Sequence, residues 1–183
     1  MVYVFLADGF EEIEALACVD ILRRAGVAVQ MVSVNSTNAV TGSHSIEVRA
    51  DITTEKVDLA NIECAVYPGG MPGAETLSSG EDTTPNMVAK YCVENDILVG
   101  AICAAPLVLG RLSLLSGKNA TCYPGFENEL TGAIATGERV TVDGNIVTGR
   151  GPGCSIDFAF ALVSKLKGES VALEIRKAMQ CDD

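Results

Sequence analysis

The chain contains 183 residues, has a formal net charge of -11 and is 48% hydrophobic. No basic run exceeds the length of the pair Arg23-Arg24, so neither nucleic acid nor an anionic membrane surface is expected as a partner, because both require a basic face. No apolar run reaches the length of a membrane span. Seven cysteines without a CxxC pair, and a single histidine, predict reduced thiols, no metal site and a cytoplasmic location.

Apolar and amphipathic segments alternate through the first half of the chain. Residues 2–6 predict a buried strand, and residues 11–25 an amphipathic helix with acids in its first turn, as the helix dipole prefers. Asp8 or Gly9 is the expected cap of this helix, and Gly26 ends it. The remaining expected elements are strands at 27–34 and 64–67, a small hairpin around 42–45, and a loop with a short helical piece at 51–61.

The second half repeats this alternation and adds a hairpin. Asp143-Gly144 between two β-branched segments is a strong two-residue turn signal. The chain is also rich in glycine after two expected strands, at residues 68–73 and 149–153. The expected elements are helices at 84–95, 106–115, 155–166 and 171–179, strands at 97–102, 120–124, 139–142 and 145–148, and a helical turn at 127–130.

The order of these elements predicts the fold class. Core strands that lack polar alternation, and that alternate with helices, are typical of a doubly wound α/β sandwich with a mostly parallel sheet and helices on both faces. We expect a single domain over residues 1–183. Sites in such sheets lie beyond the carboxyl ends of the strands, which here are followed by loops at residues 8–14, 68–73 and 103–106.

Cys103 lies where an apolar strand meets a helix that opens with Pro106. This position is similar to the sharp strand-to-helix turn that exposes a nucleophile above a sheet. A thiol near a helix N-terminus also experiences the positive end of the dipole, which favours the thiolate. The alternative is an inert core cysteine, which is the common role of cysteine in cytosolic proteins and the expected role of Cys18, Cys64 and Cys92.

Four segments together resemble the ThiJ/PfpI superfamily, in the branch that contains the parkinsonism-associated protein deglycase. Their order and spacing fit the family nearly end to end. The segments are residues 8–14 (Asp-Gly-Phe-Glu-Glu-Ile-Glu), 68–70 (Pro-Gly-Gly), 101–106 (Ala-Ile-Cys-Ala-Ala-Pro) and 150–153 (Arg-Gly-Pro-Gly).

This resemblance implies a flavodoxin-like fold, a homodimer and a site without a cofactor. Cys103 matches the family's nucleophile and Glu14 its partner carboxylate. Gly70 and Ala104 match the backbone N–H groups of an oxyanion hole. The branch is described as acting on reactive dicarbonyls such as methylglyoxal and on glycated proteins.

Four further residues are candidate contacts for a substrate or an anion. Gly69 and Pro152 belong to the matching segments. Tyr123 stands where many members of the wider family carry a histidine near the active cysteine. His44, the only histidine, belongs to the expected hairpin, so it is either a site contact or a solvated loop residue, and an ordinary Cys-His dyad is not expected.

Several functions remain open at this point. The residues allow Cys103 to attack an aldehyde while Glu14 moves protons, which would give a glyoxalase or deglycase. They equally allow Cys103 to act as an oxidative-stress sensor, or the chain to be a redox-regulated chaperone. Other branches of the superfamily are called peptidases, which the missing histidine disfavours. A thiazole-biosynthesis label used for some bacterial members finds no support in these residues.

Overall fold

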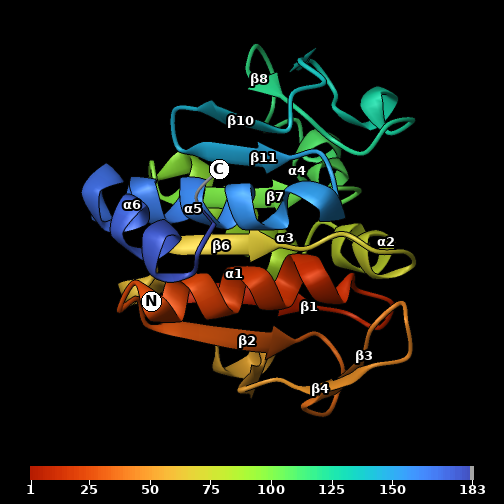
Figure 1. Ribbon diagram of the computed structural model, residues 1–183. Helices are drawn as coiled ribbons and strands as arrows, with labels where there is room; N and C mark the ends of the chain where they lie inside the picture. Colours follow the sequence, from red (N-terminus) through yellow and green to blue (C-terminus); the bar gives the residue numbers. More distant parts are fainter. Residues whose placement is uncertain (182–183) are drawn as a thin grey trace.

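A seven-stranded sheet forms the centre of the protein in the computed structural model, which describes residues 1–181 (Figure 1). The strand order is β10-β11-β7-β6-β1-β2-β5, and every neighbouring pair is parallel except β10 with β11. The expected doubly wound sheet is therefore confirmed. The strands are β1 (Val2–Leu6), β2 (Val29–Ser33), β5 (Ile52–Thr53), β6 (Cys64–Tyr67), β7 (Leu98–Ile102), β10 (Val140–Asp143) and β11 (Ile146–Gly149).

Helices cover both faces of this sheet. Side chains alternate across a strand, so Val2, Val4 and Leu6 of β1 join one apolar core while Tyr3 and Phe5 join the other. The first core is closed by α1 (Glu12–Arg24), α5 (Ser155–Lys167) and α6 (Glu169–Ala178), which lie in front of the sheet in Figure 1. The second core is closed by α2 (Gly73–Ser78), α3 (Thr84–Glu94) and α4 (Pro106–Arg111).

Short elements complete the chain, and most differences from the sequence expectation fall among them. The edge strand β5, the helix α2 and the strand β9 were not predicted, and the helix after Cys103 ends at Arg111 rather than near residue 115. Each missed element is too short to show a periodicity. The short elements are the hairpin β3 (Ala39–Thr41) and β4 (Glu47–Arg49), the pair β8 (Asn119–Ala120) and β9 (Ile134–Ala135), and 3-10 turns at Thr54–Lys56, Leu59–Asn61, Glu127–Glu129 and Pro152–Cys154.

The expected cap of the first helix is wrong. Glu11 occupies the N-cap position of α1, and no side chain caps it. Asp8 instead accepts hydrogen bonds from the backbone N–H of Thr41 (2.9 Å) and from Asn35 Nδ2 (3.0 Å). Asp8 therefore fixes the β3–β4 hairpin against the loop after β1. Figure 1 shows this hairpin projecting beyond the carboxyl ends of the strands.

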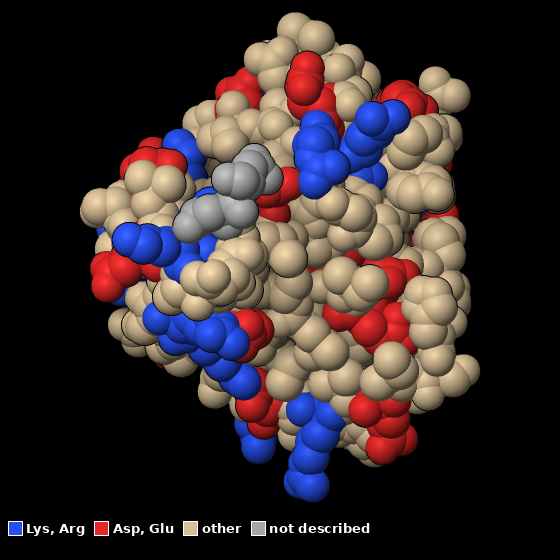
Figure 2. Space-filling view, in the orientation of Figure 1, with Lys and Arg blue, Asp and Glu red and all other residues tan. Residues whose placement is uncertain are grey.

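Charged side chains are spread over the surface. On the face drawn in Figure 2, Lys and Arg form small separate groups interleaved with Asp and Glu. This distribution agrees with the acidic net charge of -11. Within residues 1–181, none of the helices combines the length and the apolar character that crossing a membrane requires.

Candidate active site

Three loops meet at the carboxyl edge of the sheet, beyond the neighbouring strands β1, β6 and β7. The backbone N–H of Glu11, after β1, donates to Gly69 O after β6 at 2.9 Å. The N–H of Gly69 in turn donates to Glu14 Oε2 at 2.7 Å. The structure thus joins the loops that the sequence placed at the ends of separate strands.

Cys103 occupies the sharp turn between β7 and α4. Its φ of 63° is left-handed, which is unusual for a residue other than glycine and stores strain. Two backbone hydrogen bonds hold this conformation: Cys103 N donates to Gly149 O (2.9 Å), and Tyr123 N donates to Cys103 O (2.8 Å). The side chain is only 9% exposed, so the structure presents the thiol in a confined space.

Glu14 lies in the first turn of α1 and is completely buried. Its Oε2 accepts a hydrogen bond from the N–H of Gly69. Its Oε1 has no hydrogen-bond partner among the described residues. Burial raises the pKa of Glu14 to about 7, against the lowering effects of the Gly69 N–H and the Cys103 thiol. A carboxyl group in this state gains or loses a proton near neutral pH.

Glu14 and Cys103 meet across Gly69. A Cβ atom added at Gly69 would lie 2.7 Å from Cys103 Cβ, 2.8 Å from Glu14 Oε2 and 3.0 Å from Ala104 N. These distances are shorter than real side chains tolerate, so only glycine allows the carboxyl group and the thiol to approach each other here. Gly69, which stays a candidate substrate contact, fits between the carboxyl group and the thiol.

The Cys103 thiol is affected by burial, by Glu14 and by two backbone donors. Burial and next the charge of Glu14 raise the pKa of Cys103 to about 12, while hydrogen bonds from the N–H groups of Ala104 and Gly70 lower it. The sequence predicted that the dipole of the following helix would favour the thiolate. In the structure burial outweighs this effect, because α4 has only six residues. Protonation of Glu14 removes the effect of its charge, so the thiolate is less unfavourable when Glu14 carries the proton.

The two acids consequently form a coupled pair. No Lys, Arg or His side chain within residues 1–181 contributes to the pKa of either group. Two adjacent anions disfavour each other, so the pair retains one proton around neutral pH. That proton resides on the sulfur or on the carboxyl group. The N–H groups of Gly70 and Ala104 stabilise the form with the proton on the carboxyl group, in which the sulfur is negative.

Tyr123 and Pro152 line an open cavity of about 330 Å³ together with Arg150 and Cys154. Tyr123 is 46% exposed, and a Cβ atom added at Gly151 would lie 3.2 Å from its ring. Because the Tyr123 backbone also contacts Cys103, this cavity adjoins the turn that carries the thiol. Both residues remain candidate substrate contacts.

His44 lies elsewhere. Among the described residues, no hydrogen bond or ion pair joins it to Cys103 or Glu14. Its Nδ1 is 2.8 Å from Glu12 Oε2 and 3.7 Å from Glu11 Oε2. The sequence reasoning missed these two glutamates, which it assigned only to the helix dipole, because nothing in the sequence places the hairpin against the start of α1.

The remaining cysteines are buried, except Cys181, which is half-buried. All seven are free thiols, and burial raises the pKa of Cys18, Cys64 and Cys92. Cys154 is 4% exposed, and its Sγ donates to Arg139 O at 3.0 Å. Cys103 alone combines a strained backbone, a carboxyl neighbour and N–H donors within the described part of the chain.

The fold and the site define a flavodoxin-like α/β protein with a buried cysteine at a strand-to-helix turn. The model of the DJ-1/PfpI family matches residues 1–165. The chain therefore belongs to the DJ-1/PfpI family.

Known relatives agree with this assignment. Protein DJ-1 homolog B of Arabidopsis thaliana is 39% identical over 178 residues, which cover 97% of this chain and 40% of that protein. Protein dj-1beta of Drosophila melanogaster is 33% identical, with 96% of this chain and 94% of that protein covered. The chain thus spans less than half of the plant relative but nearly all of the insect one.

A solved relative matches the fold over almost the whole chain. The structure of oxidized Toxoplasma gondii DJ-1 superposes with a TM-score of 0.92 at 36% sequence identity. The match covers 98% of this chain and 97% of the other. The flavodoxin-like fold expected from the sequence is therefore confirmed.

Proposed function

We propose that the protein is a cofactor-independent glyoxalase or deglycase that acts on small dicarbonyls such as methylglyoxal, with Cys103 as nucleophile. One observation carries this proposal: the Glu14 carboxyl group and the N–H groups of Gly70 and Ala104 converge on the Cys103 sulfur. A nucleophile beside a proton carrier and two fixed donors suits addition to a carbonyl.

The first step forms a bond between Cys103 Sγ and the aldehyde carbon. The thiolate form of the pair, with the proton on Glu14, attacks, and the carbonyl electron pair moves to oxygen. The N–H groups of Gly70 and Ala104 stabilise the negative oxygen, which then takes a proton from Glu14. The product of this step is a hemithioacetal.

The second step isomerises the hemithioacetal. Glu14, now a carboxylate, removes the proton from the former aldehyde carbon and delivers it to the neighbouring carbon. The hydroxyl proton of the former aldehyde carbon passes to the neighbouring oxygen, which gives a 2-hydroxy thioester. Water then cleaves the thioester and releases lactate and the free thiol. The overall reaction adds one water to methylglyoxal, so it requires neither an oxidant nor a reductant.

The test is lactate formation from methylglyoxal, without glutathione or added metal. Wild type should produce lactate, Cys103→Ala should produce none, and Glu14→Gln should lose most turnover because the amide cannot carry the proton. Cys181→Ala is the matched control, since it removes a free thiol outside the site, and it should retain full activity. Full turnover in Cys103→Ala or Glu14→Gln would exclude the mechanism.

A second candidate function is oxidative-stress sensing through Cys103. The same donors that hold a carbonyl oxygen would hold the oxygens of a sulfinic acid, which forms when two successive equivalents of hydrogen peroxide oxidise the thiolate. The Toxoplasma gondii relative was solved in an oxidized form, which supports this reading. Sulfinate confined to Cys103 in peroxide-treated protein, with negligible methylglyoxal turnover, would favour the sensor over the enzyme.

We also propose a cytoplasmic location, which the free thiols support. The acidic net charge of -11 supports the proposal that the protein binds neither nucleic acid nor a membrane surface. Peptidase activity is not proposed, because no histidine of the described chain pairs with Cys103.

A further inference from the structure

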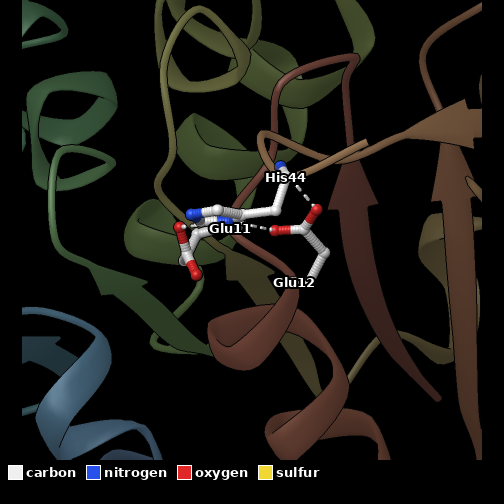
Figure 3. Close-up of side chains that lie close together, drawn as sticks. All are labelled: Glu11, Glu12 and His44. Atoms are coloured by element: carbon white, nitrogen blue, oxygen red, sulfur yellow. Dashed lines mark hydrogen bonds and ion pairs between the residues drawn. The ribbon is translucent and has the colours of Figure 1, made fainter. Parts of the chain in front are cut away.

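His44, Glu11 and Glu12 form a cluster of metal-ligating groups that the proposed reaction does not use. Figure 3 shows the Glu11 and Glu12 carboxylates, at the start of α1, close to the His44 imidazole of the β3–β4 hairpin. One nitrogen of His44 and one oxygen of each glutamate lie within 4.8 Å of one another. Both glutamates are buried, with exposures of 9% and 5%, whereas the imidazole is exposed and accessible from solvent.

Ser43 supplies a fourth polar atom beside these three. Its Oγ is 3.1 Å from Glu11 Oε2, 3.2 Å from Glu12 Oε2 and 3.1 Å from His44 Nδ1. Nδ1 lies 2.8 Å from the Glu12 oxygen and 3.7 Å from the Glu11 oxygen. These five separations bring four candidate ligand atoms into one cluster.

Those separations match the shell of a tetrahedral metal ion. Zinc bound at about 2.1 Å to nitrogen and oxygen ligands separates neighbouring ligand atoms by roughly 3.4 Å. Five of the six separations among the four atoms, from 2.8 to 3.7 Å, bracket that value, and the two carboxylate oxygens lie within 4.8 Å of each other. A set of one imidazole and two carboxylates also suits zinc better than magnesium or calcium, which prefer oxygen ligands alone.

Neighbouring contacts hold the ligands in place. The backbone N–H of His44 donates to Glu12 Oε1 at 2.7 Å, which leaves Oε2 directed at the imidazole. The backbone of Glu11 is fixed by its hydrogen bond to Gly69 O. Two buried carboxylates facing one imidazole leave an excess of negative charge, which a divalent cation would neutralise.

We propose that Glu11, Glu12 and His44, assisted by the Ser43 hydroxyl, form a binding site for a divalent metal ion of the zinc type. This site is separate from the Cys103 nucleophile and contradicts the expectation, drawn from the single histidine, that the chain holds no metal. A bound ion at this site fixes the β3–β4 hairpin to the start of α1.

The test is a calorimetric titration of metal-free protein with Zn²⁺. Wild type should bind one ion per chain, and His44→Asn should bind at least about tenfold more weakly. Asn is the informative substitution because its Nδ2 retains the hydrogen bond to Glu12. Glu11→Gln tests the second ligand and should show a similar loss. Glu47→Gln, an exposed glutamate of the same hairpin, is the matched control and should bind as wild type.

Two further measurements make the result decisive. Zn²⁺ should raise the unfolding temperature of wild type but not of His44→Asn, while the metal-free proteins should unfold at similar temperatures. Bound Co²⁺ should show no sulfur-to-metal charge-transfer absorption, because no cysteine belongs to the site. Equal Zn²⁺ affinity in wild type and His44→Asn, or a strong sulfur charge-transfer band, would overturn the proposal and reduce the cluster to an ion pair.

Discussion

At the scale of single residues, Cys103 and Glu14 determine each other's chemistry. Neither has an ordinary environment: burial raises the pKa of Glu14 to about 7, and burial together with the Glu14 charge raises that of Cys103 to about 12. Ionising one group makes ionising the other harder. We therefore propose that the two groups act together as the nucleophile, with the backbone donors of Gly70 and Ala104 lowering the cost of a negative sulfur.

A stability measurement tests the buried carboxyl group. The folded-state pKa of Glu14 lies above its ordinary value of 4.5, so the folded protein holds this proton more tightly than the unfolded chain. The stabilisation is complete below pH 4.5 and is lost as the pH rises through 7, by about 3 kcal/mol. Glu14→Gln avoids this loss, and we expect urea unfolding at pH 8 to show it more stable than wild type by about 1–3 kcal/mol.

The same comparison at pH 5 serves as the control. There Glu14 is protonated and neutral in the folded protein, so the advantage of the glutamine variant should largely disappear. A difference between the two proteins that stays constant from pH 5 to pH 8 would show that Glu14 does not titrate as its burial implies.

Local sequence predicted only part of the site. The strand-to-helix turn indicated Cys103, whereas the roles of Glu14, Gly70 and Ala104 were implied by the family resemblance and stay predictions. The structure brings the four residues together. His44 was not predictable in this way, because its neighbours Glu11 and Glu12 belong to an element distant in sequence. The position of Gly69 between the carboxyl group and the thiol depends on distances that no sequence pattern encodes.

At the scale of elements, the loop after β6 sets the spacing of the site. Gly69→Ala would introduce a Cβ atom 2.7 Å from Cys103 Cβ and 2.8 Å from Glu14 Oε2. We expect this substitution to reduce methylglyoxal turnover on the order of 100-fold, because the proton carrier and the nucleophile are displaced. The accompanying loss of stability should be about 1–3 kcal/mol, measured by urea unfolding.

Gly153→Ala is the matched comparison for this change. A Cβ atom at Gly153 meets nothing within 4 Å, so the variant should unfold and turn over as wild type does. Equal activity of the two alanine variants would show that the Gly69 loop does not position the reacting groups.

Long elements were predicted well and short ones poorly. The strands Val2–Leu6 and Cys64–Tyr67 and the helix Glu12–Arg24 show clear apolar patterns over their whole length. The edge strand Ile52–Thr53 has two residues and is defined only by its pairing with β2. Its formation depends on tertiary contact, which local sequence does not reveal.

At the scale of the whole molecule, the acidic surface carries a few exposed apolar side chains. Ile13 of α1 and Ile46 beside the β3–β4 hairpin are 58% and 53% exposed. The two elements are linked by the Ser43 hydroxyl, which donates to Glu11 Oε2 at 3.1 Å. Exposed apolar side chains are typical of protein interfaces, and the family resemblance indicates either the hairpin around His44 or the pair Arg23-Arg24 as part of a dimer seam.

We therefore expect a homodimer that uses this surface. Sedimentation of wild type should give twice the mass of one chain, and Ile46→Lys should shift the protein to monomer because it would bury an unpaired charge. Leu173→Lys replaces a side chain of similar exposure on α6 and should leave the dimer intact. Dissociation by Leu173→Lys alone would place the interface on α6 instead.

The overall architecture follows from features that are strong in the sequence. Apolar strands, amphipathic helices and glycine-rich loops in alternation permit few arrangements, and the doubly wound sheet was predicted from them. The single domain expected over residues 1–183 stays a prediction. Subunit contacts depend on surface complementarity, which composition and periodicity do not specify.

The most direct test of the central claim is the rate of Cys103 alkylation by iodoacetamide as a function of pH, in wild type and in Glu14→Gln. If the two groups share one proton, the wild-type rate should rise to a plateau with an apparent pKa near the Glu14 value of about 7. In Glu14→Gln this step should vanish, and reactivity should appear only at alkaline pH. Identical profiles in the two proteins would contradict the account, because Cys103 would then ionise independently of Glu14.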